Sequence, residues 1–155
     1  MVSEIKPAVL FVDDEVNNLN SFKASFRRDF DIHLAGSPEE GRKVLGEIPI
    51  EVIITDQRMP QETGVEFLES IIPLYPEAMR ILLTGYADIQ AVIDAVNKGK
   101  IYHYVSKPWD ETQLRSLINN ATEIYRLRQQ NNQLTKDLIR VNDQLEFLLR
   151  QNLLS

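Results

Sequence analysis

Short apolar runs alternate with segments of helical periodicity along the first two thirds of the chain, and four runs end at a reactive polar residue. The runs are VLFV before Asp13 and Asp14, EVIIT before Asp56, ILL before Thr84 and YHYVS before Lys107. Apolar runs of this length are typical of buried strands, and aligned parallel strands bring their carboxyl ends to one sheet edge. We therefore expect these side chains to meet in one crevice, where open parallel sheets bind ligands.

The order of the predicted elements is regular. Strand and helix patterns alternate five times, with strands expected at 9–12, 31–35, 51–55, 80–83 and 101–105. Such alternation indicates a parallel sheet covered on both faces by right-handed crossovers. The predicted fold is an α/β, flavodoxin-like, doubly wound sheet of five parallel strands in the order 2-1-3-4-5, with its switch point between strands one and three. A dinucleotide-binding fold needs a glycine-rich turn after the first strand, and VDDEVNN follows it instead.

Composition and charge narrow the classes of function. The chain has 155 residues, no cysteine and two histidines, so disulfides are excluded and a zinc centre is disfavoured. No apolar run approaches the roughly 20 residues of a membrane span, and no signal peptide is evident, so we expect a cytoplasmic protein without membrane association. The net charge of -6 disfavours direct nucleic-acid binding.

Four motifs carry a resemblance to a known family. VDDE, TDQRMP with Gly64 after it, LLTGYAD and YVSKPW stand in an order and spacing similar to the receiver domain of two-component response regulators, over about residues 7 to 122. Singly, each motif has a structural explanation, since adjacent aspartates are common in turns and a strand-terminal Asp or Thr often caps a helix. Their joint occurrence at four strand ends favours the receiver. The resemblance implies a phosphoprotein of a two-component system, phosphorylated on Asp56 by a histidine kinase or phosphotransfer protein.

The acidic residues suit this chemistry. A carboxylate attacks a phosphoryl group only if a cation neutralises their mutual repulsion. Grouped hard carboxylate oxygens such as those of Asp13 and Asp14 suit Mg²⁺. The resemblance implies direct metal contact by Asp14, Asp56 and the backbone carbonyl of Arg58, with Asp13 acting mainly through metal-bound water. It also implies that the protein is not an enzyme, beyond assisting its own phosphorylation and dephosphorylation.

The other pocket residues have roles implied by the family. Lys107 would pair with the acidic cluster and then with the phosphoryl oxygens, and the Thr84 hydroxyl would donate to one of them. The peptide bond before Pro108 is expected to be cis. Tyr104 is expected to move inward when Thr84 is drawn toward the phosphate, and we expect Tyr102 to share its strand face.

Two further positions distinguish this chain from simpler receivers. Arg58 stands two residues after Asp56, and Tyr86 two residues after Thr84. In the family, side chains at these places flank the path of the water that hydrolyses the acyl phosphate. Bulk there is expected to slow the loss of phosphate, although a guanidinium could interact with the phosphoryl group instead.

The pattern of residues after Asp110 predicts a helix that extends beyond the receiver domain. From its N-cap at Asp110 the helix continues without glycine or proline, so we assign residues 1–122 to the receiver and 123–155 to a continuous coiled-coil helix. Apolar positions alternate at spacings of three and four, as in a heptad seam. The seam residues are Ile124, Leu127, Asn131, Leu134, Leu138, Val141, Leu145 and Leu148. The alternative is an amphipathic helix folded back on its own sheet.

Asn131 at an a position favours a parallel dimer in fixed register, and Glu123 at g can meet Arg128 at e of the partner. The predicted function is thus signal transduction by a dimeric receiver that passes its change to a helical stalk. In its DQRMP, LLTGYAD and KPW segments the chain resembles receivers joined to output domains. No output domain is evident in this sequence, so we expect either a fragment of a longer regulator, with a missing or separate output domain, or a coiled coil that itself binds the partner. A phosphorylation-independent dimeric scaffold is the alternative. A phosphohydrolase is disfavoured, because such enzymes carry a second carboxylate two residues after the nucleophile, where Arg58 stands.

Overall fold

The computed structural model describes residues 5–154, apart from the side chains of Tyr86 and Leu154. Its sheet has five parallel strands in the order β2-β1-β3-β4-β5, which confirms the predicted fold. The strands are β1 (Ala8–Val12), β2 (Asp31–Ala35), β3 (Val52–Asp56), β4 (Met79–Thr84) and β5 (His103–Ser106). The helices are α1 (Val16–Phe26), α2 (Pro38–Glu47), α3 (Gly64–Ile71), α4 (Ile89–Asn97) and α5 (Glu111–Leu154), with a 3₁₀ turn η1 (Tyr86–Asp88) before α4.

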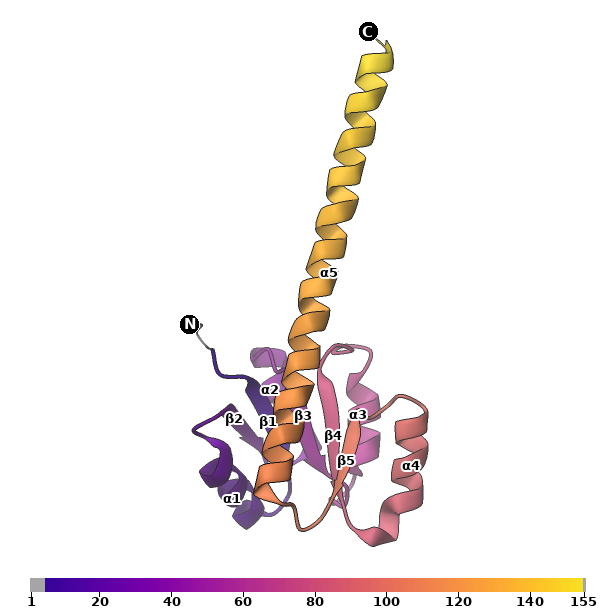
Figure 1. The fold of residues 1–155 in the computed structure, drawn as a ribbon. Coiled ribbons are helices and arrows are strands. Elements are labelled where there is room, and N and C mark those ends of the chain that lie inside the picture. Colours follow the sequence, from indigo (N-terminus) through magenta and orange to yellow (C-terminus); the bar gives the residue numbers. More distant parts are fainter. Residues whose placement is uncertain (1–4, 155) are drawn as a thin grey trace.

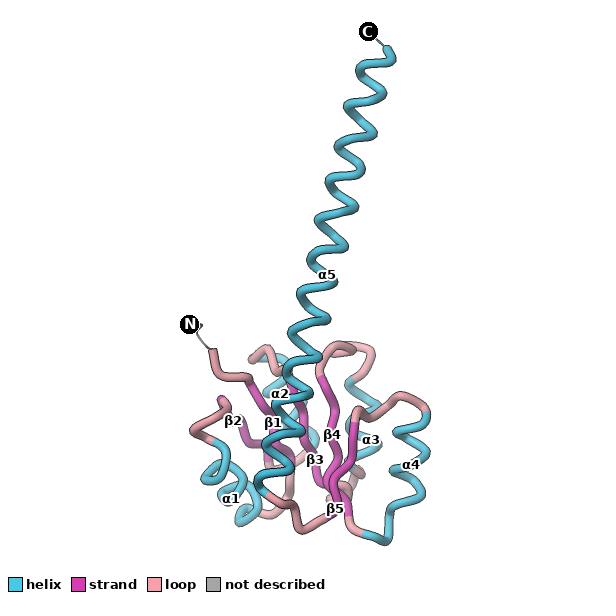
Figure 2. The backbone as a smooth tube through the Cα atoms, in the orientation of Figure 1, coloured by secondary structure: helices cyan, strands magenta, loops and turns pink. Residues whose placement is uncertain are grey.

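Helices cover both faces of the sheet (Figures 1 and 2). Because side chains alternate along a strand, Val9 and Phe11 of β1 enter a core cluster with α1 and α5, whereas Leu10 and Val12 enter a second cluster with α2, α3 and α4. All four side chains are fully buried. A strand buried on both faces explains why the sequence shows a continuous apolar run there rather than an alternating one.

The last strand differs from its prediction. β5 runs from His103 to Ser106, two residues later than expected, so Tyr102 precedes the strand. Tyr102 packs against the α1 and α5 cluster, and Tyr104 packs against the other cluster. The expected common face of the two tyrosines is therefore wrong, because strand alternation does not extend to a residue outside the strand.

Helix α5 crosses one face of the sheet and then continues far beyond it (Figure 1). Its 44 residues span about 66 Å at the usual rise per residue. Asp110 caps it as predicted, accepting a bond from the Gln113 amide at 3.0 Å. Among the described residues, no helix is long and apolar enough to cross a membrane.

Contacts with the receiver continue past residue 122. Arg126 forms a bidentate pair with Glu51, at 2.8 and 3.1 Å, and Asn132 Nδ2 donates to Glu77 Oε2 at 2.9 Å. Ile124 packs against the α1 and α5 cluster of its own domain, so this first predicted seam position belongs partly to the receiver core. The receiver therefore holds its stalk helix for longer than the predicted domain boundary implies.

Candidate functional site

The predicted pocket residues meet at the carboxyl edge of the sheet. Asp56 ends β3 and Thr84 ends β4, while Asp13 and Lys107 directly follow β1 and β5. β1 and β3 are neighbours although β2 lies between them in the sequence, so the acids come together at the switch point.

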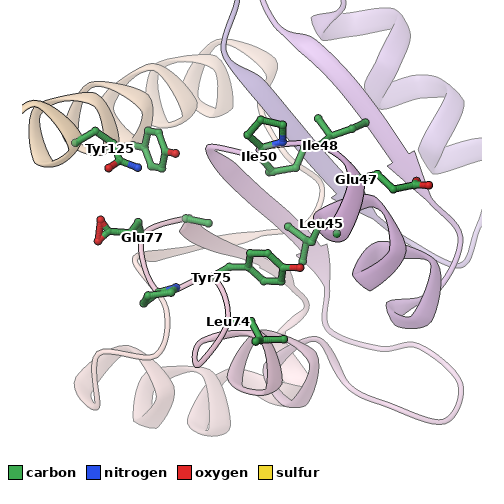
Figure 3. Close-up of a pocket in the computed structure, with 13 residues that line it drawn as sticks. Leu45, Glu47, Ile48, Ile50, Leu74, Tyr75, Glu77 and Tyr125 are labelled. Carbon is green, nitrogen blue, oxygen red and sulfur yellow. The ribbon is translucent and has the colours of Figure 1, made fainter. Parts of the chain in front are cut away.

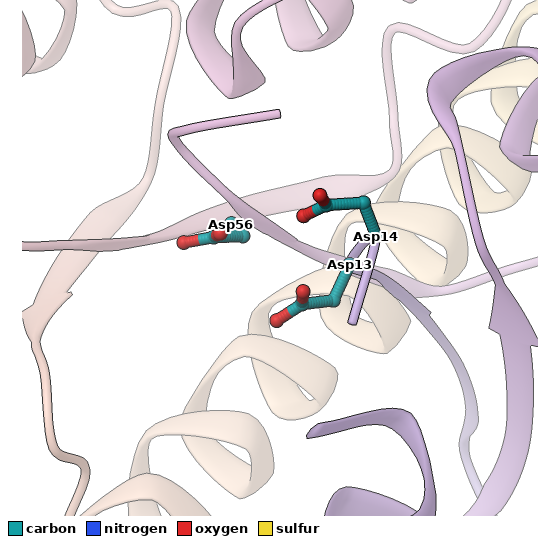
Figure 4. Close-up of side chains that lie close together, drawn as sticks. All are labelled: Asp13, Asp14 and Asp56. Carbon is teal, nitrogen blue, oxygen red and sulfur yellow. The ribbon is translucent and has the colours of Figure 1, made fainter. Parts of the chain in front are cut away.

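Three carboxylates form a compact cluster there (Figure 4). One oxygen from each of Asp13, Asp14 and Asp56 lies within 4.8 Å of the others. Asp13 is fully buried, and its oxygens already accept bonds from the Glu15 amide at 2.9 Å and from Asn18 Nδ2 at 3.1 Å. Asp14 is exposed. This donor set fits a hard divalent cation, and Asp13 is in addition held by its own hydrogen bonds.

Lys107 completes the pocket. Its Nζ lies 2.6 Å from Asp56 Oδ1, and its amide donates to the Thr84 carbonyl at 2.9 Å. The peptide bond to Pro108 is cis, as predicted. Burial raises the pKa of Asp56, and the hydrogen bond and charge of Lys107 oppose this rise. The Asp56 carboxylate thus sits in a site that disfavours its charge, which a divalent cation would offset.

The Thr84 hydroxyl is engaged elsewhere in this structure. It is buried and donates to the Gly85 carbonyl at 3.1 Å. Tyr104 is half-buried against the α2, α3 and α4 cluster. Both residues lie where the sequence placed them, and the hydroxyl has a local acceptor that it would leave on turning toward a phosphoryl group.

The loop after Asp56 is held by contacts that were not predicted from the sequence. The Gln57 side chain is buried and its Oε1 accepts a bond from the Val65 amide at 2.9 Å, which ties the loop to the start of α3. A Cβ on Gly64 would lie 2.3 Å from the Asp56 carbonyl oxygen, so only glycine fits there. Thr63 and Glu66 form a capping box at the start of α3, which the TGVE segment signals in the sequence.

Arg58 points to a partner on the next loop. Its Nε donates to Asp88 Oδ2 at 2.9 Å, which raises the pKa of the guanidinium. This contact bridges the segments that follow β3 and β4, which are neighbouring strands. The predicted companion, the Tyr86 side chain, lies outside the described part of the structure.

A cavity of about 410 Å³ lies at the edge of the sheet opposite this polar pocket. It opens between the loops that precede β3 and β4 and the base of the stalk (Figure 3). Tyr75, Tyr125 and Ile50 are among its lining residues. The cavity marks where α5 leaves the domain, far along the strands from Asp56.

Comparisons with known proteins agree with this geometry. The family model for the response regulator receiver domain matches residues 9–119. The chain belongs to this family. Its receiver resembles the hydrogenase transcriptional regulatory protein HoxA of Bradyrhizobium diazoefficiens, with 36% identity over 81% of this chain and 26% of the relative. The chain spans about a quarter of the length of the curated relatives it matches.

Solved receiver structures superpose closely on this one. A response regulator receiver domain protein from Clostridium thermocellum is 32% identical, with a TM-score of 0.74 over 78% of this chain and 98% of that chain. A structure titled as an adenylate cyclase from Rhodopirellula baltica is 28% identical, with a TM-score of 0.82 over 85% of this chain and 98% of that chain. Similar folds therefore occur among solved structures titled as a receiver domain protein and as an adenylate cyclase.

Proposed function

We propose that this receiver accepts a phosphoryl group on Asp56 from a histidine kinase or phosphotransfer protein. The observation that carries the proposal is the Lys107 to Asp56 pair, at 2.6 Å, inside a cluster of three carboxylates. An Asp56 carboxylate oxygen forms the new O–P bond while the N–P bond of the donor phosphohistidine breaks. The imidazole nitrogen keeps the electron pair and takes up a proton from solvent.

Asp13, Asp14, Asp56 and the Arg58 carbonyl are proposed to hold Mg²⁺. The ion supplies positive charge that offsets the repulsion between the acceptor and the incoming phosphate. Lys107 contributes the second positive charge, and it exchanges its bond to Asp56 for bonds to phosphoryl oxygens. The chain assists this transfer and the later hydrolysis, and it acts on no separate substrate.

The switch is proposed to run through Thr84 and Tyr104. The hydroxyl leaves the Gly85 carbonyl and donates to the phosphoryl group, and the space that it vacates admits the tyrosine ring. Thr84 ends β4, which pairs with β5, and Tyr104 lies in β5, which leads through Lys107 into α5. A shift at this edge therefore reaches the stalk helix through a short covalent path.

The stalk is proposed to dimerise as a parallel coiled coil. Its apolar seam has no cover within the described chain, since side chains from Leu127 to Leu148 are 44 to 69% exposed. Contiguous exposed apolar stripes of this kind mark interaction sites. The stalk then carries the phosphorylation signal to an output domain or to a separate partner.

Intact mass and oligomeric state, measured together, test the proposal. Wild type and Asp56→Asn are incubated with acetyl phosphate and Mg²⁺. We expect one phosphoryl mass on wild type and none on the variant. Glu39→Gln, which replaces an exposed acid outside the carboxylate cluster, serves as the control and should behave as wild type. If the mass does not increase in a way that depends on Asp56, the acceptor role is rejected. If the mass increases but the oligomeric state does not change, a scaffold is favoured.

A further inference from the structure

Arg128 stands at the base of the stalk beside a second arginine. Its Nη1 lies 3.8 Å from Met79 Sδ at the start of β4, and the charge of Arg128 acts on Arg80, the next residue of that strand. Burial and then this neighbouring charge lower the pKa of Arg80. Two like charges are therefore held together at the point where α5 leaves the domain.

Within residues 5–154 no carboxylate forms an ion pair with either arginine. Arg80 donates to the carbonyls of Lys100 and Ala78, at 2.8 and 3.0 Å, which satisfies its hydrogen bonds without neutralising its charge. Among the acids of neighbouring segments, Glu51 pairs with Arg126, and Glu77 accepts a bond from the neutral amide of Asn132. Neither arginine therefore has a carboxylate partner of its own in the described receiver.

An acid that could pair with Arg128 lies on the same helix, but its side chain points in a different direction. Glu123 is exposed and has no ion-pair partner in the described chain. It precedes Arg128 by five residues, and five residues turn an α-helix by about 140° beyond a full revolution. The two side chains therefore cannot meet on one helix, whereas this spacing is the one that joins g of one parallel helix to e of its partner.

We propose that Glu123 of a second copy of this chain docks on Arg128 at the base of β4, twice in each dimer by two-fold symmetry. The inference rests on the proposed parallel dimer, and it places the Glu123 to Arg128 contact that the heptad pattern predicts against β4 of the receiver. It brings the partner's carboxylate to the amino end of the strand whose other end carries Thr84. Each receiver is then in contact with the stalk of the other protomer, rather than only with its own.

Charge reversal on the full chain tests this contact by sedimentation equilibrium. Glu123→Arg and Arg128→Glu each replace two attractions by two repulsions, so each should raise the dimer dissociation constant about tenfold. The double variant Glu123→Arg, Arg128→Glu restores opposite charges and should return to within about threefold of wild type. Raising the salt concentration should shrink all these differences.

Matched controls use charges on the outer faces of the same helix. Glu146→Arg and Arg150→Glu lie at b and f positions of the heptad and should leave association unchanged. Far-ultraviolet circular dichroism checks that helicity is equal in all variants.

A monomeric wild type, single reversals no weaker than the controls, or a double variant weaker than both singles would each overturn the contact. Phosphorylation of Asp56, followed by mass in the same samples, reports the acceptor role separately, so the two proposals can fail independently.

Discussion

Arg58 and Asp88 join the segments that follow β3 and β4, beside the proposed phosphoacceptor Asp56. Arg58 Nε donates to Asp88 Oδ2 at 2.9 Å, although 30 residues separate them in the sequence. Asp88 is also the N-cap residue of α4, and its side chain makes no capping bond there. The Asp88 carboxylate thus accepts a bond from the Arg58 guanidinium and does not cap the helix. The position of Arg58 is therefore coupled to the start of α4.

Truncating Arg58 and Tyr86 should shorten the life of an acyl phosphate on Asp56. Replacing Arg58 and Tyr86 together by alanine should speed hydrolysis about tenfold, which corresponds to about 1.4 kcal/mol, because water then reaches the phosphorus more freely. Loss of the phosphoryl mass with time measures the rate. Arg28→Ala, an exposed arginine remote from the pocket, is the control.

Asp88→Asn tests whether the ion pair holds Arg58 in its shielding position. Its effect on the lifetime should have the same sign as that of Arg58→Ala, and the two should combine less than additively because they break one interaction. An unchanged lifetime in the Arg58 and Tyr86 double variant would reject shielding altogether.

Gly64→Ala should destabilise the domain strongly. The new Cβ would lie 2.3 Å from the Asp56 carbonyl oxygen, and this backbone atom cannot move aside without shifting the acceptor. We expect a loss of about 2–3 kcal/mol, typical of overpacking, in chemical denaturation. Gly46→Ala is the matched control, since its Cβ would meet only the Tyr75 hydroxyl at 3.9 Å. Equal effects of the two substitutions would contradict the close approach.

The buried charge of Asp56 predicts a pH-dependent stability. Because burial raises the pKa of Asp56 above its ordinary value of 3.8, the folded chain holds this proton more tightly than the unfolded chain. The resulting stability is complete below the unfolded pKa and is lost as pH rises through the folded pKa. In metal-free buffer near pH 7, Asp56→Asn should therefore raise Tm. The gain should vanish toward pH 3, and its absence at neutral pH would show that Lys107 already outweighs burial.

Mg²⁺ should stabilise the wild-type fold through the acidic cluster. Binding to the native state alone raises stability by mass action, so Tm should increase with Mg²⁺ concentration. Asp14→Asn removes an exposed carboxylate of the cluster and should weaken the Mg²⁺ affinity by about tenfold or more. Glu15→Gln, the adjacent acid outside the cluster, should retain the wild-type response. Equal responses of the two variants would place the ion elsewhere.

The pocket could be predicted from the sequence because each member follows an apolar strand. Asp56, Thr84 and Lys107 lie where the pattern placed them, and the strand order followed from alternation of strands and helices. The period of the apolar residues along the chain indicates which residues are buried, so the strands, the helices and the edge that the strands share can be predicted from the sequence. The seam from Leu127 onward is likewise a matter of spacing along one helix, and its partner remains a prediction.

Tertiary structure alone decided the contacts between distant segments. The sequence contains no local signal that joins Arg58 to Asp88, Gln57 to Val65 or Arg126 to Glu51. It also placed Tyr102 on the wrong face, because the start of β5 depends on its pairing with β4. Periodicity along the chain thus determined which faces are buried. The packing of the helices and strands against one another decided which long polar side chains meet. A long side chain can reach several neighbours, and the spacing of residues along the chain does not determine which of these neighbours it contacts.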